Sequence, residues 1–273
     1  MNERTLETGT EQLLGSVRDH VATLTFNRPE KRNALGDIVT PALRRMLREV
    51  DEDPDVRVLV ITGAGQAFCS GGDVSGMGST TDGPARSHQD KVRGLQQKQY
   101  ELTLRLHEMS MPTIASLPGA AAGAGMSIAL ACDLRIASET AFLAPGFARV
   151  GLSGDYGASW FLNRLVGPAE AKELFFTGRR VQSDEALALG LFNEVVPFDD
   201  LANRTHELAT QIASGPPIAI RYMKQNIDRA SAADLRTCLD WEAERTVTCS
   251  ATDDHKEAVS SFREKRVPDF QGH

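Results

Sequence analysis

Two short glycine-rich segments are the stretches of this chain best suited to hold a negative charge. They are residues 67–73 (AFCSGGD) and 119–125 (GAAAGAG), and each follows a run typical of a buried strand, 56–62 and 113–117. Small residues between a strand and a helix leave backbone N–H groups without intrahelical partners, and the helix dipole favours an anion there. Two such ends together could stabilise an oxyanion, although either alone could serve only close packing or a positive φ.

Several further motifs accompany these segments. They are NRPEKRNAL at 27–35, Cys132-Asp133, GLSGD at 151–155 and NRLVG at 163–167. In this order and spacing they resemble the crotonase superfamily, the enoyl-CoA hydratases and isomerases, from about Val17 to the C-terminal SFREKR at 261–266. The resemblance implies an α/β fold, a crotonase-like right-handed spiral of repeated β-β-α units with a C-terminal helical trimerisation module. It also implies an acyl-CoA substrate.

By motif position, the resemblance assigns the two oxyanion donors to the backbone N–H groups of Gly72 and Ala124. Removing a proton from the α-carbon of a thioester, or adding water to its double bond, places negative charge on the thioester oxygen, which these donors would stabilise. Ala124 stands where the family usually has the middle glycine of Gly-Gly-Gly. A methyl group there leaves the N–H in place, so we expect the oxyanion hole to be retained.

Proton transfer is where the chain departs most from the hydratases. Their two catalytic glutamates are replaced by Ser127 and Phe147. Asp155 lies four residues after Gly151, where relatives of the dienoyl-CoA isomerase, ring-opened phenylacetyl-CoA isomerase and chlorobenzoyl-CoA dehalogenase types place a catalytic aspartate. One carboxylate in an apolar pocket can move a proton between two carbons. Phe147 and Trp160 are expected to supply the apolar surroundings. The alternative is that Asp155 caps the helix expected at 156–158.

Dehalogenation by Asp155 would need a histidine to activate water, and neither His88 nor His107 sits in a recognisable motif. Nucleophilic catalysis by Cys69 is disfavoured because no basic residue lies beside it in sequence. The four cysteines have neither metal-ligand nor disulfide-scaffold spacing, so no metal site is expected. No cofactor is expected either, since coenzyme A enters as part of the substrate.

For the coenzyme, the resemblance places Arg28 and Lys31 on the loop that meets the phosphates and Lys265 on a helix that reaches a neighbouring subunit's nucleotide. Solvent exposure is the usual role of such charges, and for Arg32 and Arg266 it is an equal alternative. Four further residues complete the predicted substrate-binding set with these three cations: Ala67, Cys69, Asp73 and Phe147. Asp73, which follows the first oxyanion donor, is expected to be structural rather than a base.

Composition bounds the remaining classes of function. The chain has 273 residues, 41% of them hydrophobic, and a formal net charge of -7. This balance argues against a nucleic-acid or membrane-surface binder. No apolar run approaches membrane-spanning length and the first ten residues are polar, so a cytoplasmic protein is expected.

The elements that must position these groups follow from local pattern. Residues 17–26 predict two strands turning at Asp19-His20, after a frayed arm over 1–15. Thr40 before Pro41 predicts an N-cap, and the apolar residues that follow predict a helix: Leu43, Met46, Leu47 and Val50. Residues 75–99 predict a mobile loop before a helix with apolar positions at Leu102, Leu104, Leu106 and Met109. The resemblance implies that this loop borders the acyl pocket.

From Pro168 the pattern is helical almost to the end, which divides the chain into a core over 1–200 and a helical oligomerisation module over 201–273. The tail carries apolar positions that a repeat core need not cover: Leu235, Leu239, Trp241 and Val247. Because the resemblance implies that this region forms trimers, often paired into hexamers, a homotrimer or dimer of trimers is expected. For activity, double-bond isomerisation is favoured over hydration, and a catalytically silent acyl-CoA binder is the alternative from another class.

Overall fold

The computed structural model describes residues 3–73 and 87–273. Within them, seven strands form a large sheet in the order β1-β2-β3-β4-β6-β8-β11. Their bounds are Arg4–Thr5, Leu13–Arg18, Val21–Phe26, Val58–Gly63, Thr113–Leu117, Leu134–Ser138 and Glu194–Val196. A smaller sheet has the order β10-β9-β7-β5, with bounds Val181–Gln182, Phe142–Ala144, Ala120–Ala122 and Ala67–Cys69. From β3 to β11 every neighbouring pair in the large sheet is parallel.

A β-β-α unit repeats along the chain, as the sequence predicts. In three successive units one strand joins the large sheet, the next joins the small sheet, and a helix follows. The helices are α2 (His88–Gln99), α4 (Ala124–Ala131) and α5 (Ala158–Thr177). Because each unit shifts by one strand in both sheets and β5, β7 and β9 are parallel neighbours, the carboxyl ends of these three strands lie at one edge of the small sheet.

The first unit differs because both of its strands, β2 and β3, lie in the large sheet. They form an antiparallel hairpin whose two turn residues, Asp19 and His20, have φ of 52° and 62°. Such left-handed pairs match the twist of the flanking strands, and the predicted turn is confirmed. Helix α1 (Val39–Glu52) follows and buries Leu43, Met46, Leu47 and Val50, as predicted. Each such side chain contributes roughly 1.5 to 3 kcal/mol through its removal from water.

Three local predictions are wrong. Thr40 is not an N-cap, because α1 begins at Val39 after Ile38 and Thr40 is itself buried. The arm before the hairpin is not frayed throughout, since β1 pairs with β2 and Leu13 is fully buried. The helix before Leu102 begins already at His88, where Ser87 caps it by accepting a hydrogen bond from Asp90 N–H.

Helix α2 continues through a π-helical turn, η3 (Tyr100–Leu104), into α3 (Arg105–Glu108). Leu102, Leu106 and Met109 are buried as predicted, whereas Leu104 is exposed. The first part of the loop predicted over 75–99 falls on residues 75–86, which lie outside the described residues.

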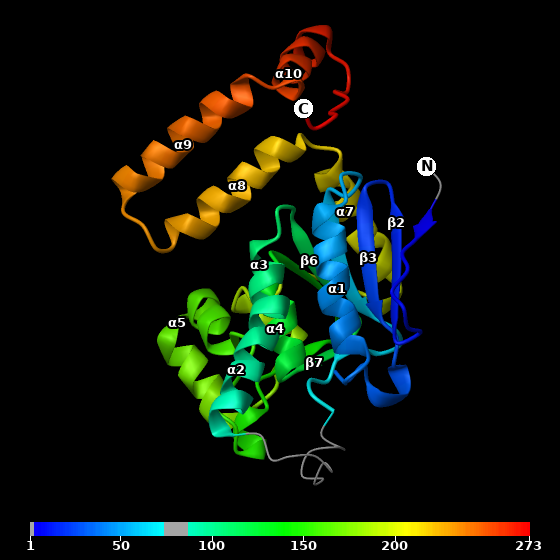
Figure 1. Ribbon diagram of the computed structural model, residues 1–273, viewed down its shortest axis with the longest axis vertical. Helices are drawn as coiled ribbons and strands as arrows, with labels where there is room; N and C mark the ends of the chain where they lie inside the picture. The colour runs from blue at the N-terminus through cyan, green and yellow to red at the C-terminus, as the bar shows by residue number, and fades with distance from the viewer. Residues whose placement is uncertain (1–2, 74–86) are drawn as a thin grey trace.

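The C-terminal part is helical, as predicted: α6 (Ser183–Ala188), α7 (Leu201–Ala213), α8 (Pro217–Ala230), α9 (Leu235–Ser250) and α10 (Asp253–Glu264). Helix α7 packs on the large sheet, where Leu201 and Ala209 join a second apolar cluster with residues of β3, β4, β6 and β8. Helices α8, α9 and α10 extend from the body of the molecule (Figure 1). Lys224 of α8 is tied to the body through an ion pair of 2.8 Å with Asp133.

A boundary after residue 200 remains a prediction. None of the described helices is long and apolar enough to cross a membrane.

Candidate active site

The two glycine-rich segments lie side by side, as the sequence predicts. Strands β5 and β7 pair in parallel, with Ala67 opposite Ala120. A Cβ added to Gly71 would lie 2.7 Å from the Ala122 carbonyl oxygen. A Cβ added to Gly125 would lie 2.2 Å from the Cys69 carbonyl oxygen. Only glycine permits this approach of the two backbones, so these glycines fix the distance between the segments.

The backbone leaves an N–H group available in each segment. At the bridge between Leu35 and Gly72, Leu35 N–H donates to the Gly71 carbonyl (2.7 Å) and Asp73 N–H donates to the Leu35 carbonyl (2.9 Å). This pairing does not use the N–H of Gly72. Ala124 is the first residue of α4, where an N–H has no intrahelical acceptor. Both residues line one cavity of about 460 Å³.

Asp155 lines the same cavity. Its side chain is half-buried, and its Oδ1 atom is fully buried with no hydrogen-bond partner among the described residues. Burial raises the pKa of this carboxyl above its ordinary value, because the charged form loses hydration. The alternative role as a helix cap is not what the structure shows, since α5 begins at Ala158 after Gly157 and no side chain caps it.

The surroundings of Asp155 are largely apolar. Phe147 is 5% exposed and stacks on Phe175 with 5.9 Å between ring centroids. Val150 and Leu152 also line the cavity. Trp160 does not, contrary to the prediction: it lines a separate cavity, where Arg164 lies over its ring at 3.6 Å.

Ser127 is fully buried on α4, where its hydroxyl faces the carbonyl oxygens of Asp155 (3.1 Å) and Gly123 (3.3 Å). His107 contacts the Trp160 ring at 5.1 Å between centroids and lines the separate cavity with it. No histidine is among the described residues that line the site cavity. The described residues of this cavity therefore provide no histidine to activate water for the hydrolytic step of a dehalogenase.

The predicted coenzyme contacts lie in different surroundings. The Arg28 guanidinium donates to the Ala34 carbonyl (2.6 Å) and pairs with Asp73 at 3.3 Å, which ties the loop after β3 to the first glycine segment. Lys31 is exposed at the end of η1 (Pro29–Lys31), and Lys265 is exposed after α10. Figure 1 shows α10 at one end of the molecule and α2 and α5 at the other. Contact of these residues with the nucleotide remains a prediction.

Ala67 and Cys69 are buried in β5 and are not among the described residues that line the site cavity. The Ala67 carbonyl accepts a hydrogen bond of 2.7 Å from Asn33 Nδ2. Burial raises the pKa of the Cys69 thiol to about 12, so this residue is a poor nucleophile at neutral pH. Their predicted role in substrate binding, like that of Asp73, remains a prediction.

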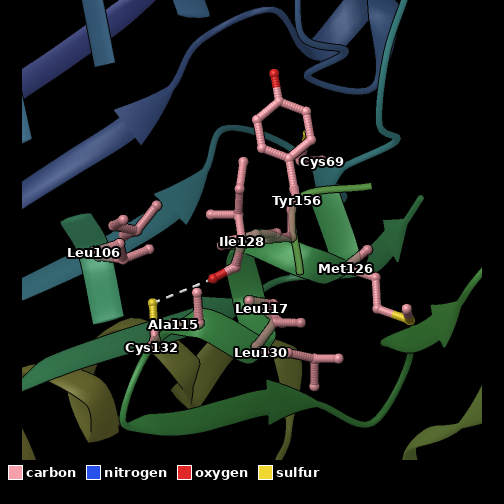
Figure 2. Close-up of a cluster of buried hydrophobic side chains, with 14 of the residues drawn as sticks. Cys69, Leu106, Ala115, Leu117, Met126, Ile128, Leu130, Cys132 and Tyr156 are labelled. Atoms are coloured by element: carbon pink, nitrogen blue, oxygen red, sulfur yellow. Dashed lines mark hydrogen bonds between the residues drawn. The ribbon is translucent and has the colours of Figure 1, made fainter. Parts of the chain in front are cut away.

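Sequence reasoning missed three residues beside the site. Arg44 of α1 and Tyr156 line the cavity, and the Gln99 side chain accepts a hydrogen bond of 2.7 Å from Tyr156 N–H. Burial raises the pKa of the Tyr156 phenol, while the charge of Arg44 and its side-chain hydrogen bond lower it. Figure 2 shows the Tyr156 hydroxyl directed away from the apolar side chains of the core cluster. Adjacency to Asp155 was the one available signal for Tyr156.

Comparisons with known proteins identify relatives of this chain. The family model for enoyl-CoA hydratase/isomerase matches residues 16–273. The short-chain-enoyl-CoA hydratase of Clostridium acetobutylicum is 36% identical to this chain, over 90% of this chain and 92% of its own length. The 1,2-epoxyphenylacetyl-CoA isomerase of Escherichia coli is 34% identical over 96% of this chain and 99% of its own.

Solved structures agree as well. The crystal structure of an enoyl-CoA hydratase from Bacillus anthracis superposes with a TM-score of 0.89 at 32% identity, covering 96% of this chain and all of that one. An enoyl-CoA hydratase from Polaromonas sp. JS666 gives a TM-score of 0.87 at 31% identity, covering 94% and 99%. The chain therefore has the α/β crotonase-like fold and belongs to the enoyl-CoA hydratase/isomerase family of the crotonase superfamily.

Proposed function

We propose that this protein is an acyl-CoA isomerase that moves a carbon–carbon double bond, with Asp155 as its sole acid/base. The observation that carries the proposal is the placement of a desolvated carboxylate in the cavity that the Gly72 and Ala124 segments also line. Of the described residues lining that cavity, two are carboxylates, and the other, Asp37, is exposed near the start of α1.

The chemistry needs one group that both takes and returns a proton. The Asp155 carboxylate removes a proton from one carbon of the acyl group, and the electron pair of that C–H bond moves through the π system to the thioester oxygen. The N–H groups of Gly72 and Ala124 stabilise the enolate, each contributing roughly 3 kcal/mol as in other oxyanion sites. The protonated Asp155 then delivers the proton to another carbon, so the double bond moves and the composition is unchanged.

Hydration is the second candidate, because several relatives with more than 30% identity, including the one from C. acetobutylicum, are named hydratases. Ser127 and Phe147 provide no carboxylate to hold and activate the water. The isomerase-named relative from E. coli supports the first candidate. A silent acyl-CoA binder is the third, and it differs from both in lacking turnover.

The remaining assignments extend this proposal. Coenzyme A enters as part of the substrate, with Arg28, Lys31 and Lys265 proposed at its phosphates and Ala67, Cys69, Asp73 and Phe147 completing the binding set. The protein needs no separate cofactor, works in the cytoplasm, and assembles as a trimer or a dimer of trimers. Lys265 would then act on the nucleotide bound by a neighbouring subunit.

The test is a parallel assay of 2-enoyl-, 3-enoyl- and dienoyl-CoAs, with the products separated by mass and by chromatography. Isomerisation gives a product of unchanged mass, and hydration gives one heavier by a water molecule. A hydrated product formed faster than any isomer would favour the second candidate. Saturable binding of acyl-CoA in calorimetry with no product of either kind would favour the silent binder, and no binding would remove all three.

A further inference from the structure

The peptide group that joins Asp155 to Tyr156 is held from both sides by side chains of two different helices. Its carbonyl oxygen accepts a hydrogen bond of 3.1 Å from the Ser127 hydroxyl of α4, in addition to a local one of 3.2 Å from Ala158 N–H. Its N–H donates one of 2.7 Å to the Gln99 side-chain oxygen at the end of α2. Ser127 is fully buried and Gln99 is half-buried. The plane of this one peptide is therefore fixed relative to both helices.

The backbone at this point would not hold its shape by local preference alone. Gly154, Tyr156 and Gly157 have φ of 105°, 51° and 78°. A positive φ is disfavoured for a residue with a bulky side chain such as Tyr156, and persists where surrounding contacts determine it. The hydrogen bonds from Ser127 and to Gln99 supply such contacts on the two polar atoms of the peptide.

The orientation of the Asp155 side chain depends on this peptide, because its Oδ1 atom has no hydrogen-bond partner of its own among the described residues. Ser127 belongs to the same helix as Ala124, the proposed oxyanion donor. Helix α2 lines the cavity through Leu95 and Lys98, one residue before Gln99. The proposed base is thus connected to the helix that carries a proposed oxyanion donor and to a helix that lines the cavity.

We propose that Ser127 and Gln99 are positioning residues that clamp the 155–156 peptide and so aim the Asp155 carboxylate at the reacting carbon. This inference rests on the proposed acid/base role of Asp155. It gives Ser127 a function at the position where hydratases carry a glutamate. The hydroxyl serves as a donor to the backbone that carries the base, and it does not transfer protons itself. The competing interpretation is that Ser127 only bonds back to Gly123 one turn earlier, at 3.3 Å.

Three variants test the clamp. Ser127→Ala removes the side-chain donor and leaves the local Ala158 N–H donor in place. Gln99→Met removes the acceptor at nearly constant size, and Gln99→Glu keeps an acceptor. Gln96→Met is the matched control, because Gln96 is exposed and lies three residues earlier on the same helix. Since misplacement of a reacting group by about 1 Å costs on the order of 100-fold in rate, we expect kcat to fall about 10- to 100-fold in Ser127→Ala and Gln99→Met.

Further readouts separate positioning from stability. The KM for the acyl-CoA should change less than about threefold in both variants. The kcat of the double variant should lie within about threefold of the kcat of the slower single variant, because both substitutions act on one peptide. The acidic limb of the kcat/KM profile should move to lower pH, since a loosened Asp155 regains water and its pKa falls toward the ordinary value. Gln99→Glu should keep most of the activity, and Gln96→Met should match the wild type.

Hydrogen exchange followed by mass spectrometry of short peptides covering residue 156 tests the clamp without any turnover. The Tyr156 amide should exchange faster in Gln99→Met than in the wild type, Gln99→Glu or Gln96→Met. If the wild type shows no isomerase activity, the proposed function fails and this measurement still decides whether the clamp exists. Unchanged protection in Gln99→Met, or multiplicative losses of kcat in the double variant with an unmoved pH profile, would overturn the proposal.

Discussion

Asp155→Asn is the sharpest test of the proposed mechanism, because the substitution keeps the size of the side chain and removes its ability to carry a proton. The structure simplifies the experiment. The carboxylate caps no helix, and its Oδ1 atom has no hydrogen-bond partner among the described residues. Loss of activity in this variant therefore cannot be assigned to loss of a helix cap or of a hydrogen bond to Oδ1.

The expected loss follows from the role of Asp155 in both half-reactions. General acid–base catalysis contributes about 100- to 10,000-fold, so kcat should fall by that factor, equivalent to about 3 to 5 kcal/mol of transition-state stabilisation. Binding should change little, because the phosphates and the thioester oxygen meet other groups. The measurements are isomerisation of an enoyl-CoA followed by chromatography, and calorimetric titration with a non-reacting acyl-CoA.

Stability should change in the opposite direction from activity. Burial raises the pKa of Asp155, so the folded chain binds this proton more tightly than the unfolded chain, and stability falls as pH rises from the ordinary carboxyl pKa through the raised one. At neutral pH the wild type carries a desolvated charge that Asn removes. We expect the Tm of Asp155→Asn to equal or exceed that of the wild type at pH 7, with the difference vanishing below the ordinary pKa of about 4.

Undiminished turnover in folded Asp155→Asn would end the single-carboxylate mechanism. Asp37→Asn then identifies the alternative, because Asp37 is the other carboxylate among the described residues of the cavity. Loss of turnover in Asp37→Asn with retention in Asp155→Asn would transfer the role to Asp37. If the Tm of Asp155→Asn were instead lower than that of the wild type across the whole pH range, the Asp155 carboxylate would make a stabilising contact.

Three further predictions concern the same site and the assembly. The wild-type kcat/KM should rise with pH through an acidic limb that lies above the ordinary carboxyl pKa and is absent in Asp155→Asn, measured as initial rates across pH. Gly125→Ala should destabilise the fold by about 3 kcal/mol, since its Cβ would meet the Cys69 carbonyl at 2.2 Å. Gly94→Ala, which has open space in α2, should stabilise the fold by about 0.5 to 1 kcal/mol. Chemical denaturation compares the free energies of unfolding of the two variants. Light scattering should give the mass of a trimer or hexamer, and a concentration-independent monomer would contradict both the assembly and the proposed contact of Lys265 with a neighbour's nucleotide.

The approach of the two glycine-rich segments and the repeated unit could be predicted because local rules determine them. A close approach of two backbones permits little other than glycine, and Gly71 and Gly125 stand where that approach occurs. The buried strands are marked by apolar runs with turn residues at their ends. Asp155 could be named from motif position, while the absence of a cap at α5 could not, because Gly157 is an equally acceptable start to a helix.

The contacts that cross between units had no local signal. Gln99 reaches Tyr156 across 57 positions of the sequence, and neither residue belongs to a motif that predicts the other. The sequence pattern places Arg44 on the polar face of α1, although its side chain is only 15% exposed. The N-terminal arm is polar, and its pairing with β2 depends on a sheet edge that its own sequence does not describe.

The preference for isomerisation over hydration depends on how many proton carriers the reaction requires. Moving a double bond returns to the substrate the proton that was taken from it, so one carboxylate that cycles between two forms is sufficient. Adding water requires a group that holds and deprotonates the water while the adjacent carbon receives a proton, which the hydratases divide between two glutamates. In this chain one of those positions is a phenyl ring and the other is Ser127, whose hydroxyl proton points to a backbone carbonyl. Water held by Asp155 alone would have to compete with the substrate carbon for the same carboxylate, and this competition is why the balance of hydrated to isomerised product measures the chemistry of the site directly.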